Sequence, residues 1–360
     1  MIAKFFLLPI VAALITFVST PLVIALARRL RLVDDSAKRF HPAHTHTGVI
    51  PRAGGLAIYL GLSITILALL GISKPLMGIL LGATILLITG LFDDKKDVNP
   101  YIRIVSNILA ALCVVGSGIS IPFVTNPLTG GIIHLDTWRI SFILFGAHSF
   151  LPLANIAAIL WIVWTMNIVG WSSGIDGQLP GFVVVASLVL GMLSIRFLGQ
   201  DPAQISVLQL SLITAGSFLG FLPWNFYPQK IMPGYAGKTL AGFLLATLAI
   251  LAQAKVGTAV LVLGIPMTDA LYTLARRLVK GRSPVWADRG HLHHRLLDLG
   301  WGKRRIAVFY WLISALLGGV ALSVTARGKF FIGLLLVVWL GGLIIWANIF
   351  DSLGKKKRDT

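Results

Sequence analysis

The stretch Leu91-Phe92-Asp93-Asp94-Lys95-Lys96-Asp97-Val98-Asn99-Pro100 decides the fold, because it separates two apolar runs of membrane-spanning length. One run covers residues 75–92, and the next begins at Tyr101. Carboxylates next to hydrocarbon are costly in free energy, and they persist mostly where they face a polar cavity. The stretch is therefore either an ordinary charged loop or the entrance to a polar site. The rest of the sequence helps to decide between these two interpretations.

The composition is that of a polytopic membrane protein. Of the 360 residues, 56% are hydrophobic and 12% are charged, whereas a soluble domain carries roughly 25% charged residues. A net charge of +18 would also suit nucleic acid, but basic loops kept on the cytoplasmic side of a membrane explain it. We expect no nucleic-acid partner. The single cysteine, Cys113, lies in an apolar run and cannot form an intrachain disulfide.

Apolar runs of roughly 20 residues are long enough to cross a bilayer as helices. The sequence contains eleven such runs, at residues 5–27, 54–72, 75–92, 101–119, 151–169, 179–197, 203–222, 238–254, 257–275, 306–325 and 330–350. We predict an all-α integral membrane protein of about eleven transmembrane helices in the plasma (inner) membrane. Residues 1–350 would form a single transmembrane domain and residues 351–360 a basic cytoplasmic tail. The first run is long enough to span, and no cleavable signal peptide is evident.

The basic residues predict the orientation. If the C-terminal Lys355-Lys356-Lys357-Arg358 lies in the cytoplasm, 24 of the 31 Lys and Arg residues fall on that side. The other seven are Lys4, Lys74, Arg139, Arg196, Lys255, Arg327 and Lys329. This asymmetry is the one expected of cytoplasmic loops. The same face receives the aspartate-rich loop at 93–97, Asp176 and the histidine cluster at 291–294, so we predict a cleft that opens to the cytoplasm.

Aspartates and basic side chains at one membrane face suit an anionic substrate with a divalent cation. Mg²⁺ prefers oxygen ligands and commonly bridges carboxylates to phosphates, and Lys and Arg bind phosphate oxygens. The plainer alternative is that the basic residues only follow the positive-inside rule. The histidines of residues 288–295 could be zinc ligands, phosphate- or uridine-facing donors, or incidental side chains in a solvated loop. No cysteine or glutamate lies nearby to complete a zinc site, so phosphate or uridine binding is favoured.

Five motifs also carry a resemblance, and they occur in order between about residues 40 and 302. They are residues 46–55 (His46-Thr47-Gly48 to Gly54-Gly55), Asp93-Asp94 with Asp97, residues 167–177, Asn225-Phe226-Tyr227-Pro228, and Pro266-Met267-Thr268-Asp269 followed by Asp288-Arg289-Gly290-His291-Leu292-His293-His294-Arg295. This pattern resembles the polyprenyl-phosphate N-acetylhexosamine-1-phosphate transferases, glycosyltransferase family 4. The likeness is to the GlcNAc-1-phosphate transferases that start teichoic acid and O-antigen lipid carriers. It is weaker to the phospho-MurNAc-pentapeptide translocase.

The resemblance implies a reaction. A sugar-1-phosphate, expected to be GlcNAc-1-phosphate, would pass from a UDP-N-acetylhexosamine to polyprenyl (undecaprenyl) phosphate with release of UMP, as the first membrane step of cell-envelope polysaccharide synthesis. The implied cofactor is Mg²⁺, with Mn²⁺ as an alternative. The implied metal ligands are Asp94 and Asp176.

The resemblance also implies roles for individual residues. Asp93 and Asp94 would deprotonate or orient the lipid phosphate, and Asp176 would contact nucleotide or metal. Asn167 and Asn225 would hydrogen-bond the nucleotide sugar. The remaining substrate-binding candidates are His46, Arg52, Asp97 and Lys238, together with His291, His293, His294 and Arg295, which would hold the pyrophosphate.

Three positions depart from the family pattern. Gly170 and Ser173 stand where the family has an Asn and an Asp, and Tyr235 stands where it has a metal-binding Asp. A protonated phenol is a poor Mg²⁺ ligand. Another aspartate would then have to bind the metal, or the ammonium of Lys238 would supply part of the positive charge.

Two other functions remain open from the sequence. One is a non-catalytic homologue that binds carrier lipid or nucleotide sugar, which Ser173 and Tyr235 would suit. The other is a transporter of anionic lipid, because many spans and a basic face would suit that as well. The sequence also leaves open which hexosamine is used, which polymer is made and whether the protein forms oligomers.

The predicted orientation can be tested by cysteine labelling. Outside intact cells, a membrane-impermeant thiol reagent should label a cysteine placed at position 130 and should not label one at position 45 or 290. The reverse pattern would contradict a cytoplasmic cleft.

Overall fold

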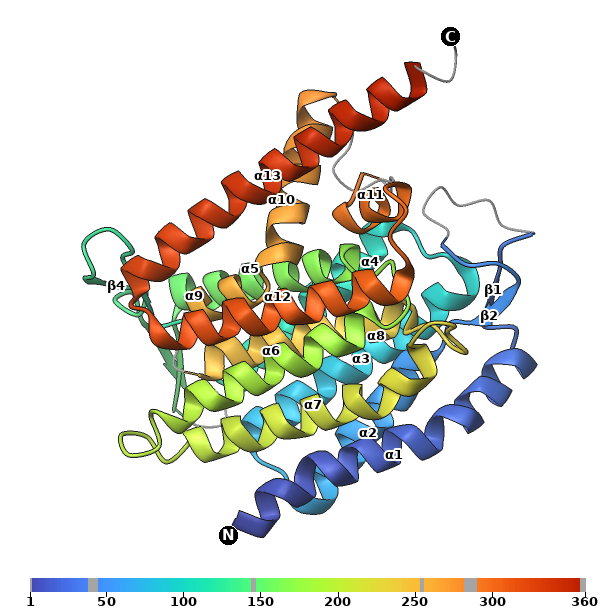
Figure 1. The fold of residues 1–360 in the computed structure, drawn as a ribbon. Helices are drawn as coiled ribbons and strands as arrows, with labels where there is room; N and C mark the ends of the chain where they lie inside the picture. The colour runs from blue at the N-terminus through green and yellow to red at the C-terminus, as the bar shows by residue number, and fades with distance from the viewer. Residues whose placement is uncertain (1, 38–44, 144–146, 253–255, 282–289, 357–360) are drawn as a thin grey trace.

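The computed structural model describes residues 2–37, 45–143, 147–252, 256–281 and 290–356, and these form a helical bundle (Figure 1). The helices are α1 Ile2–Arg29, α2 Gly54–Leu69, α3 Lys74–Lys96, α4 Pro100–Gly116, α5 Pro152–Trp171, α6 Gln178–Ile195, α7 Gln204–Asn225, α8 Gly234–Leu251, α9 Val256–Val262, α10 Gly264–Val279, α11 Leu292–Asp298, α12 Lys303–Ser323 and α13 Ala326–Lys356. The predicted all-α fold is confirmed. Helix α13 continues into the segment that was expected to be a tail.

The strands are short and lie outside the bundle. They are β1 Val33–Asp35, β2 Val49–Pro51, β3 Phe123–Thr125, β4 Ile132–His134, β5 Ile140–Ile143 and β6 Ala147–Phe150. They pair as three separate antiparallel ribbons, β1 with β2, β3 with β4, and β5 with β6. The last two ribbons occupy the segment between α4 and α5.

Within the described residues, eight helices are long and apolar enough to cross a membrane, or nine if the bent pair α9–α10 forms one span. This confirms a polytopic membrane protein. Helices α2 and α4 are apolar but contain only 16 and 17 residues. Each of the eleven predicted runs overlaps a helix, and the count of eleven spans stays a prediction.

The predicted span 257–275 is not a straight helix. The chain bends by 83° between α9 and α10, with Leu263 at the break. Proline lacks an amide hydrogen and fits only the first turn of a helix. Pro266 therefore favours a new helix start here, and α10 begins at Gly264. The bend carries α10 away from the direction of its neighbours (Figure 1).

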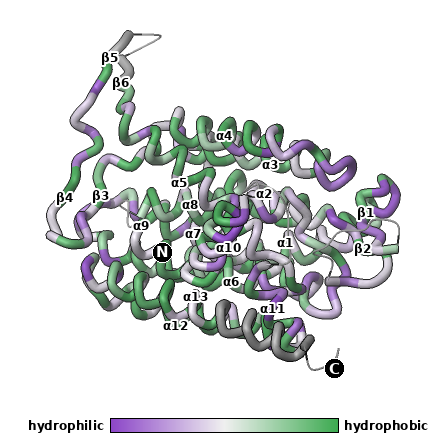
Figure 2. Tube along the Cα trace, turned by 90° about the horizontal axis from the view of Figure 1, so that it is seen from above, coloured by the Kyte–Doolittle hydropathy of each residue, from purple (hydrophilic) through white to green (hydrophobic). Residues whose placement is uncertain are grey.

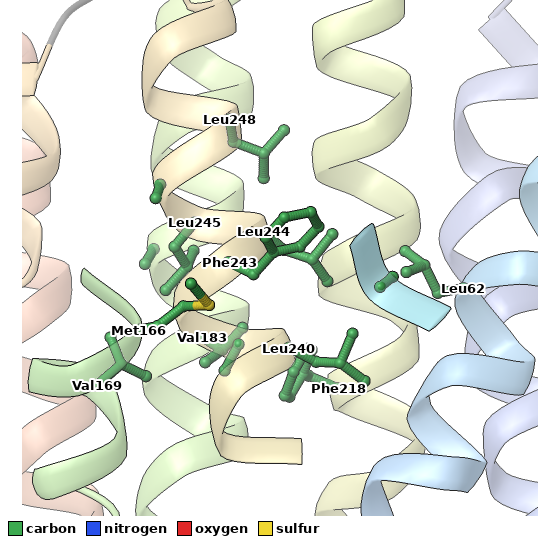
Figure 3. Packing of buried hydrophobic residues seen from close by; sticks show 14 of the residues in the cluster. Leu62, Met166, Val169, Val183, Phe218, Leu240, Phe243, Leu244, Leu245 and Leu248 are labelled. Carbon is green, nitrogen blue, oxygen red and sulfur yellow. The ribbon is translucent and has the colours of Figure 1, made fainter. Parts of the chain in front are cut away.

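Helix α8 lies inside the bundle, in contact with α2, α3, α5 and α6. Its buried Phe243, Leu244 and Leu248 belong to one hydrophobic cluster with Met166 of α5 and Phe218 of α7 (Figure 3). Small residues let backbones approach closely in membrane helices. A Cβ on Gly90 of α3 would overlap Ala236, and one on Gly242 would overlap the Met166 backbone.

One end of the bundle is polar. Helices α3 and α5 end there, while α6, α8 and α12 begin there, as their chain directions require. The β1–β2 ribbon and α11 lie at the same end (Figure 1), and hydrophilic stretches colour β1 and α11 in Figure 2. The helix middles are mostly hydrophobic in the same view. The termini of these helices therefore present polar side chains to one common site.

Candidate active site

A cleft of about 870 Å³ opens at the polar end of the bundle. Its polar lining includes Asp34, His46, Arg52, Asp93, Asp97, Arg103, Asn167, Asn225, Lys238, Arg277, His291, His293 and His294. Its apolar lining includes Leu160, Val163, Trp164 and Trp171 from α5 and Leu274 from α10. The cleft can therefore accommodate a charged group on one side and hydrocarbon on the other.

Asp93 lies at the cleft wall and is paired with Arg103. The Arg103 Nε donates to Asp93 Oδ1 at 2.6 Å, and the Val98 N–H donates to the same oxygen at 3.1 Å. Asp97 Oδ1 lies 3.9 Å from Arg103 Nη2 and 3.7 Å from Arg52 Nη1. Asp93 is 1% exposed, and a carboxylate buried this deeply needs such partners.

Asp94 lies just behind the lining and connects three segments. Its Oδ1 accepts a hydrogen bond from the Tyr235 N–H at 2.8 Å and lies 3.4 Å from Arg52 Nε. Its Oδ2 is buried and has no hydrogen-bond partner among the described residues. Asp94 therefore keeps one carboxylate oxygen that the surrounding protein does not satisfy.

Residues 231–237 are fixed to the loop before α2 by backbone hydrogen bonds. The Met232 N–H donates to the Pro51 carbonyl at 2.8 Å. The Gly54 N–H donates to the Met232 carbonyl at 3.0 Å, and the Gly55 N–H donates to the Pro233 carbonyl at 2.9 Å. Lys238 lies one turn into α8 and lines the cleft. Its ammonium group interacts electrostatically with the carboxylates of Asp93 and Asp94. The first loop and the start of α8 are thus one rigid wall of the cleft.

Asp176 and Asn225 hold the opposite wall together. Asp176 accepts from Lys303 Nζ at 3.2 Å and from the Gln229 N–H at 3.3 Å. Asn225 Oδ1 accepts from the Gly177 N–H at 3.0 Å. The Asn225 Nδ2 donates to Gln229 Oε1 and to the Ile231 carbonyl, each at 3.0 Å. The side chains of Asp176 and Asn225 therefore both make their hydrogen bonds within the protein.

The histidines form a stacked group over the cleft. The His291 and His293 rings are parallel, with centroids 5.7 Å apart, and His293 and His294 have centroids 4.3 Å apart. Burial, followed by the nearby charges of His294, His291 and Lys238, lowers the pKa of His293 well below its ordinary value. The buried surroundings of His293 therefore favour the neutral ring over the cation.

Asp269 of α10 supports this group from behind. Its Oδ2 accepts a hydrogen bond from His291 Nδ1 at 2.8 Å, and its Oδ1 accepts one from the Leu292 N–H at 2.7 Å. Asp269 and His291 are 1% and 6% exposed. Asp269 lies in α10, beyond the bend at Leu263, and reaches the histidine group from there.

Comparison with known proteins agrees with this architecture. Residues 76–253 match the model of glycosyl transferase family 4. The chain is 28% identical over 343 residues to a probable undecaprenyl-phosphate N-acetylglucosaminyl 1-phosphate transferase of Bacillus subtilis, covering 92% of this chain and 88% of the relative. It is 30% identical to a decaprenyl-phosphate N-acetylglucosaminephosphotransferase of Mycobacterium leprae, covering 85% and 80%.

The chain belongs to glycosyl transferase family 4. A third relative, the undecaprenyl-phosphate alpha-N-acetylglucosaminyl 1-phosphate transferase of Escherichia coli K12, is 29% identical and covers 82% of this chain and 77% of the relative. These matches extend across most of the bundle. The residues that match the family model include Asp93, Asp97, Asn167, Asn225 and Lys238, which line the cleft.

Most of the site residues predicted for this family 4 member line the cleft, but Asp94, Asp176 and Arg295 do not. Asp94 lies behind the wall, and Asp176 is bound to Lys303. The Arg295 Nε donates to the Gly290 carbonyl at 3.2 Å. Asn167 lines the cleft, with its Nδ2 bound to the Val163 carbonyl at 2.8 Å. Of the histidine motif, residues 288 and 289 lie outside the described residues.

Sequence reasoning missed Arg103 and assigned no role to Asp269. Both are charged side chains inside predicted spans, at 101–119 and 257–275. That position was the available signal, because a charge within a membrane segment is costly and usually functional. Their partners could not be identified, since Asp93 is ten residues from Arg103 and His291 is 22 residues from Asp269.

The residues present fit a divalent cation only in part. Among the described residues, no three His, Cys, Asp or Glu side chains gather closely enough to hold a metal ion. Of the two predicted ligands, Asp176 has both oxygens bound to the protein, whereas Asp94 has its unsatisfied Oδ2. Mg²⁺ often uses one or two carboxylates and takes its other ligands from water and substrate phosphates. Asp94 alone therefore fits the expected cation.

Tyr235 contributes its backbone to this position. Its N–H binds Asp94, while its ring lies against Arg103, with the guanidinium carbon 5.2 Å from the ring centroid. The side chain at position 235 thus packs on a cation that is itself paired with Asp93. The loop that the resemblance assigned to the metal thus lies beside Asp93 and Asp94, but without a carboxylate of its own.

Gly234 should be required for the placement of Asp94. Its φ is +68°, and a Cβ here would overlap the Arg52 carbonyl oxygen and Asp94 Oδ2. In Gly234→Ala we expect the left-handed backbone to cost about 1–2 kcal/mol and the overlap to add about 1–3 kcal/mol. Thermal unfolding in detergent should show a clear fall in Tm.

Gly71→Ala is the matched control for Gly234→Ala. Gly71 has a φ of +77°, and no atom lies within 4 Å of a Cβ placed there. Gly71→Ala should therefore lose only the free energy that the left-handed backbone costs an alanine. Equal Tm shifts in the two variants would contradict the close contact between Gly234 and Asp94.

Proposed function

We propose that this protein transfers GlcNAc-1-phosphate from UDP-GlcNAc to polyprenyl phosphate and releases UMP. The observation that carries the proposal is the cleft itself, where Arg52, Arg103 and Lys238 lie among paired aspartates and face an apolar wall. Such a cleft suits a diphosphate at one side and a prenyl chain at the other. The names of the relatives from Bacillus subtilis and Mycobacterium leprae support the same chemistry.

The proposed reaction is a single displacement at phosphorus. An oxygen of the lipid phosphate forms a bond to the phosphorus that carries GlcNAc. The bond from that phosphorus to the bridging oxygen breaks, and UMP leaves with the electron pair. Such transfers need little covalent help from the protein, so catalysis comes mainly from alignment and charge stabilisation.

Asp93 and the three cations would align the lipid phosphate. Asp93 lines the cleft, and Arg103 holds its carboxylate in place. It is positioned to orient the incoming phosphate or to accept its proton. The cations Arg52, Arg103 and Lys238 would stabilise charge that develops on the transferred phosphoryl group, an effect that is strong where water is excluded.

Mg²⁺, or Mn²⁺ in its place, is the proposed cofactor, and Asp94 Oδ2 is the protein oxygen that would hold it. When bound, the cation would neutralise phosphate charge and fix the phosphates in line. Lys238 would supply a second positive charge from the protein. His291 and His294 line the same cleft and would bind the pyrophosphate.

The test is UMP release from UDP-GlcNAc by the purified protein in detergent with polyprenyl phosphate. A transferase forms UMP and a lipid-linked sugar in equal amounts. A protein that only binds the carrier or the nucleotide sugar, or a lipid transporter, forms neither, and that outcome would refute the proposal. The same assay with other UDP-N-acetylhexosamines identifies the sugar.

Asp94→Asn should abolish most turnover in a folded protein. The amide oxygen can still accept from the Tyr235 N–H, so the fold is retained, but the anionic oxygen for the cation is lost. We expect UMP release to fall by about 10²-fold or more, measured as initial rate against Mg²⁺ concentration.

Asp136→Asn is the control for this loss of charge. Asp136 lies two residues after the end of β4, with its side chain 38% exposed and its Oδ1 3.3 Å from His134 Nδ1. The Asp136→Asn variant should release UMP at the wild-type rate. Near-normal UMP release by a folded Asp94→Asn protein would instead favour a plain charged loop at 93–97.

A further inference from the structure

Both carboxylate oxygens of Asp269 accept a hydrogen bond, and both donors belong to the start of α11. Oδ1 accepts from the Leu292 backbone N–H at 2.7 Å, and Oδ2 lies 2.8 Å from His291 Nδ1. Thr273 Oγ1 lies farther from the same Nδ1, at 3.5 Å. Asp269 does not line the cleft, but His291 does. Anything that Asp269 contributes to the cleft must therefore pass through His291.

This arrangement determines which nitrogen of His291 carries a hydrogen. An ionised carboxylate can only accept hydrogen bonds, so Nδ1 must be the donor to Asp269. In the neutral ring the other nitrogen, Nε2, then has the lone pair, and in the cation it carries a second N–H. In both forms Nε2 is the nitrogen left for contacts other than the one with Asp269.

The ring plane is fixed as well. His291 is stacked on His293 with an interplanar angle of 3°, and His293 is itself in close contact with Gly174, where a Cβ would overlap the imidazole. Asp269 and its two partners are at most 6% exposed. Burial strengthens the attraction between a carboxylate and a protonated ring.

We propose that Asp269 is a positioning residue that holds His291 in the Nδ1–H tautomer, directs Nε2 to the cleft and stabilises the ring when it is protonated. The protonated Nε2–H then donates to an oxygen of the bound diphosphate. The choice of a diphosphate rests on the proposed transferase function. The tautomer assignment rests on the Asp269 contacts alone.

Asp269→Asn should reverse the tautomer. The amide has one oxygen and one NH₂ group, and the Leu292 N–H can only donate, so it takes the oxygen. The NH₂ group then faces His291 Nδ1, which must accept, and the hydrogen moves to Nε2. The variant changes the polarity of the contact with almost no change in shape.

The tautomer can be read directly by long-range ¹H–¹⁵N NMR of the full-length protein in detergent with labelled histidine. His291→Gln identifies the His291 signals among those of the eight histidines. At a pH where the ring is neutral, we expect wild type to carry its one ring hydrogen on Nδ1 and Asp269→Asn to carry it on Nε2. A neutral wild-type ring with its hydrogen on Nε2, or an unchanged tautomer in Asp269→Asn, would overturn the proposal.

Kinetics then test whether Asp269 acts through His291. In the UMP-release assay we expect Asp269→Asn to lower kcat by about 10- to 100-fold, as loss of an orienting partner does at other sites, with little change in KM. Adding Asp269→Asn to His291→Gln should cause no further loss, because residues that act as one unit are not additive. Full additivity of the two losses would overturn the proposed route through His291.

Asp201→Asn is the matched control. The Asp201 carboxylate accepts from the Ala203 N–H and from Gln204 Nε2 at the start of α7, and neither residue lines the cleft. Asp201→Asn should leave kcat unchanged. A wild-type protein that shows the Nδ1–H tautomer but releases no UMP would refute the proposed function and leave the Asp269–His291 assignment standing. The two failures are therefore distinguishable.

Discussion

The structure depends on the pairing of buried carboxylates with donors from distant parts of the chain. An unpaired charge in a membrane bundle is too costly to bury. Asp93 is paired with Arg103, Asp94 with Arg52 and the Tyr235 N–H, Asp176 with Lys303, and Asp269 with His291. Each pair joins two different segments, so the same contacts that make the charges tolerable also assemble the cleft.

This constraint explains why the helix termini converge. The donors to Asp94 come from the loop before α2 and from the first residues of α8, and those segments are bound to each other by backbone hydrogen bonds. The donors to Asp269 come from the start of α11, and Asp269 itself lies in α10, directly after the bent α9–α10 pair. The contact therefore joins the helix that follows the bend to the segment that carries the histidines.

Much of the fold could be predicted from the sequence, because apolar length and the placement of Gly and Pro are local properties. The apolar runs and the polar loops between them follow from these properties. The grouping of Asp93, Asp97, Lys238 and the histidines came instead from the distribution of basic residues and from the family resemblance, and all of these residues line the cleft. What could not be predicted is which polar atoms the protein uses for itself. Asn225 has the residue type of a ligand contact, yet its amide binds Gly177, Gln229 and Ile231. Asp176 is likewise satisfied by Lys303 and Gln229, and no sequence pattern shows this.

The departure at Tyr235 also has a simple physical basis. What Asp94 takes from this position is a backbone N–H, which any residue other than proline supplies. The position is therefore free to change its side chain as long as Gly234 keeps its left-handed backbone and the loop keeps its hydrogen bonds. A tyrosine here packs its ring on Arg103, the cation that neutralises Asp93. Tyrosine at this position thus leaves the loop without a carboxylate of its own and supports the cation that neutralises Asp93.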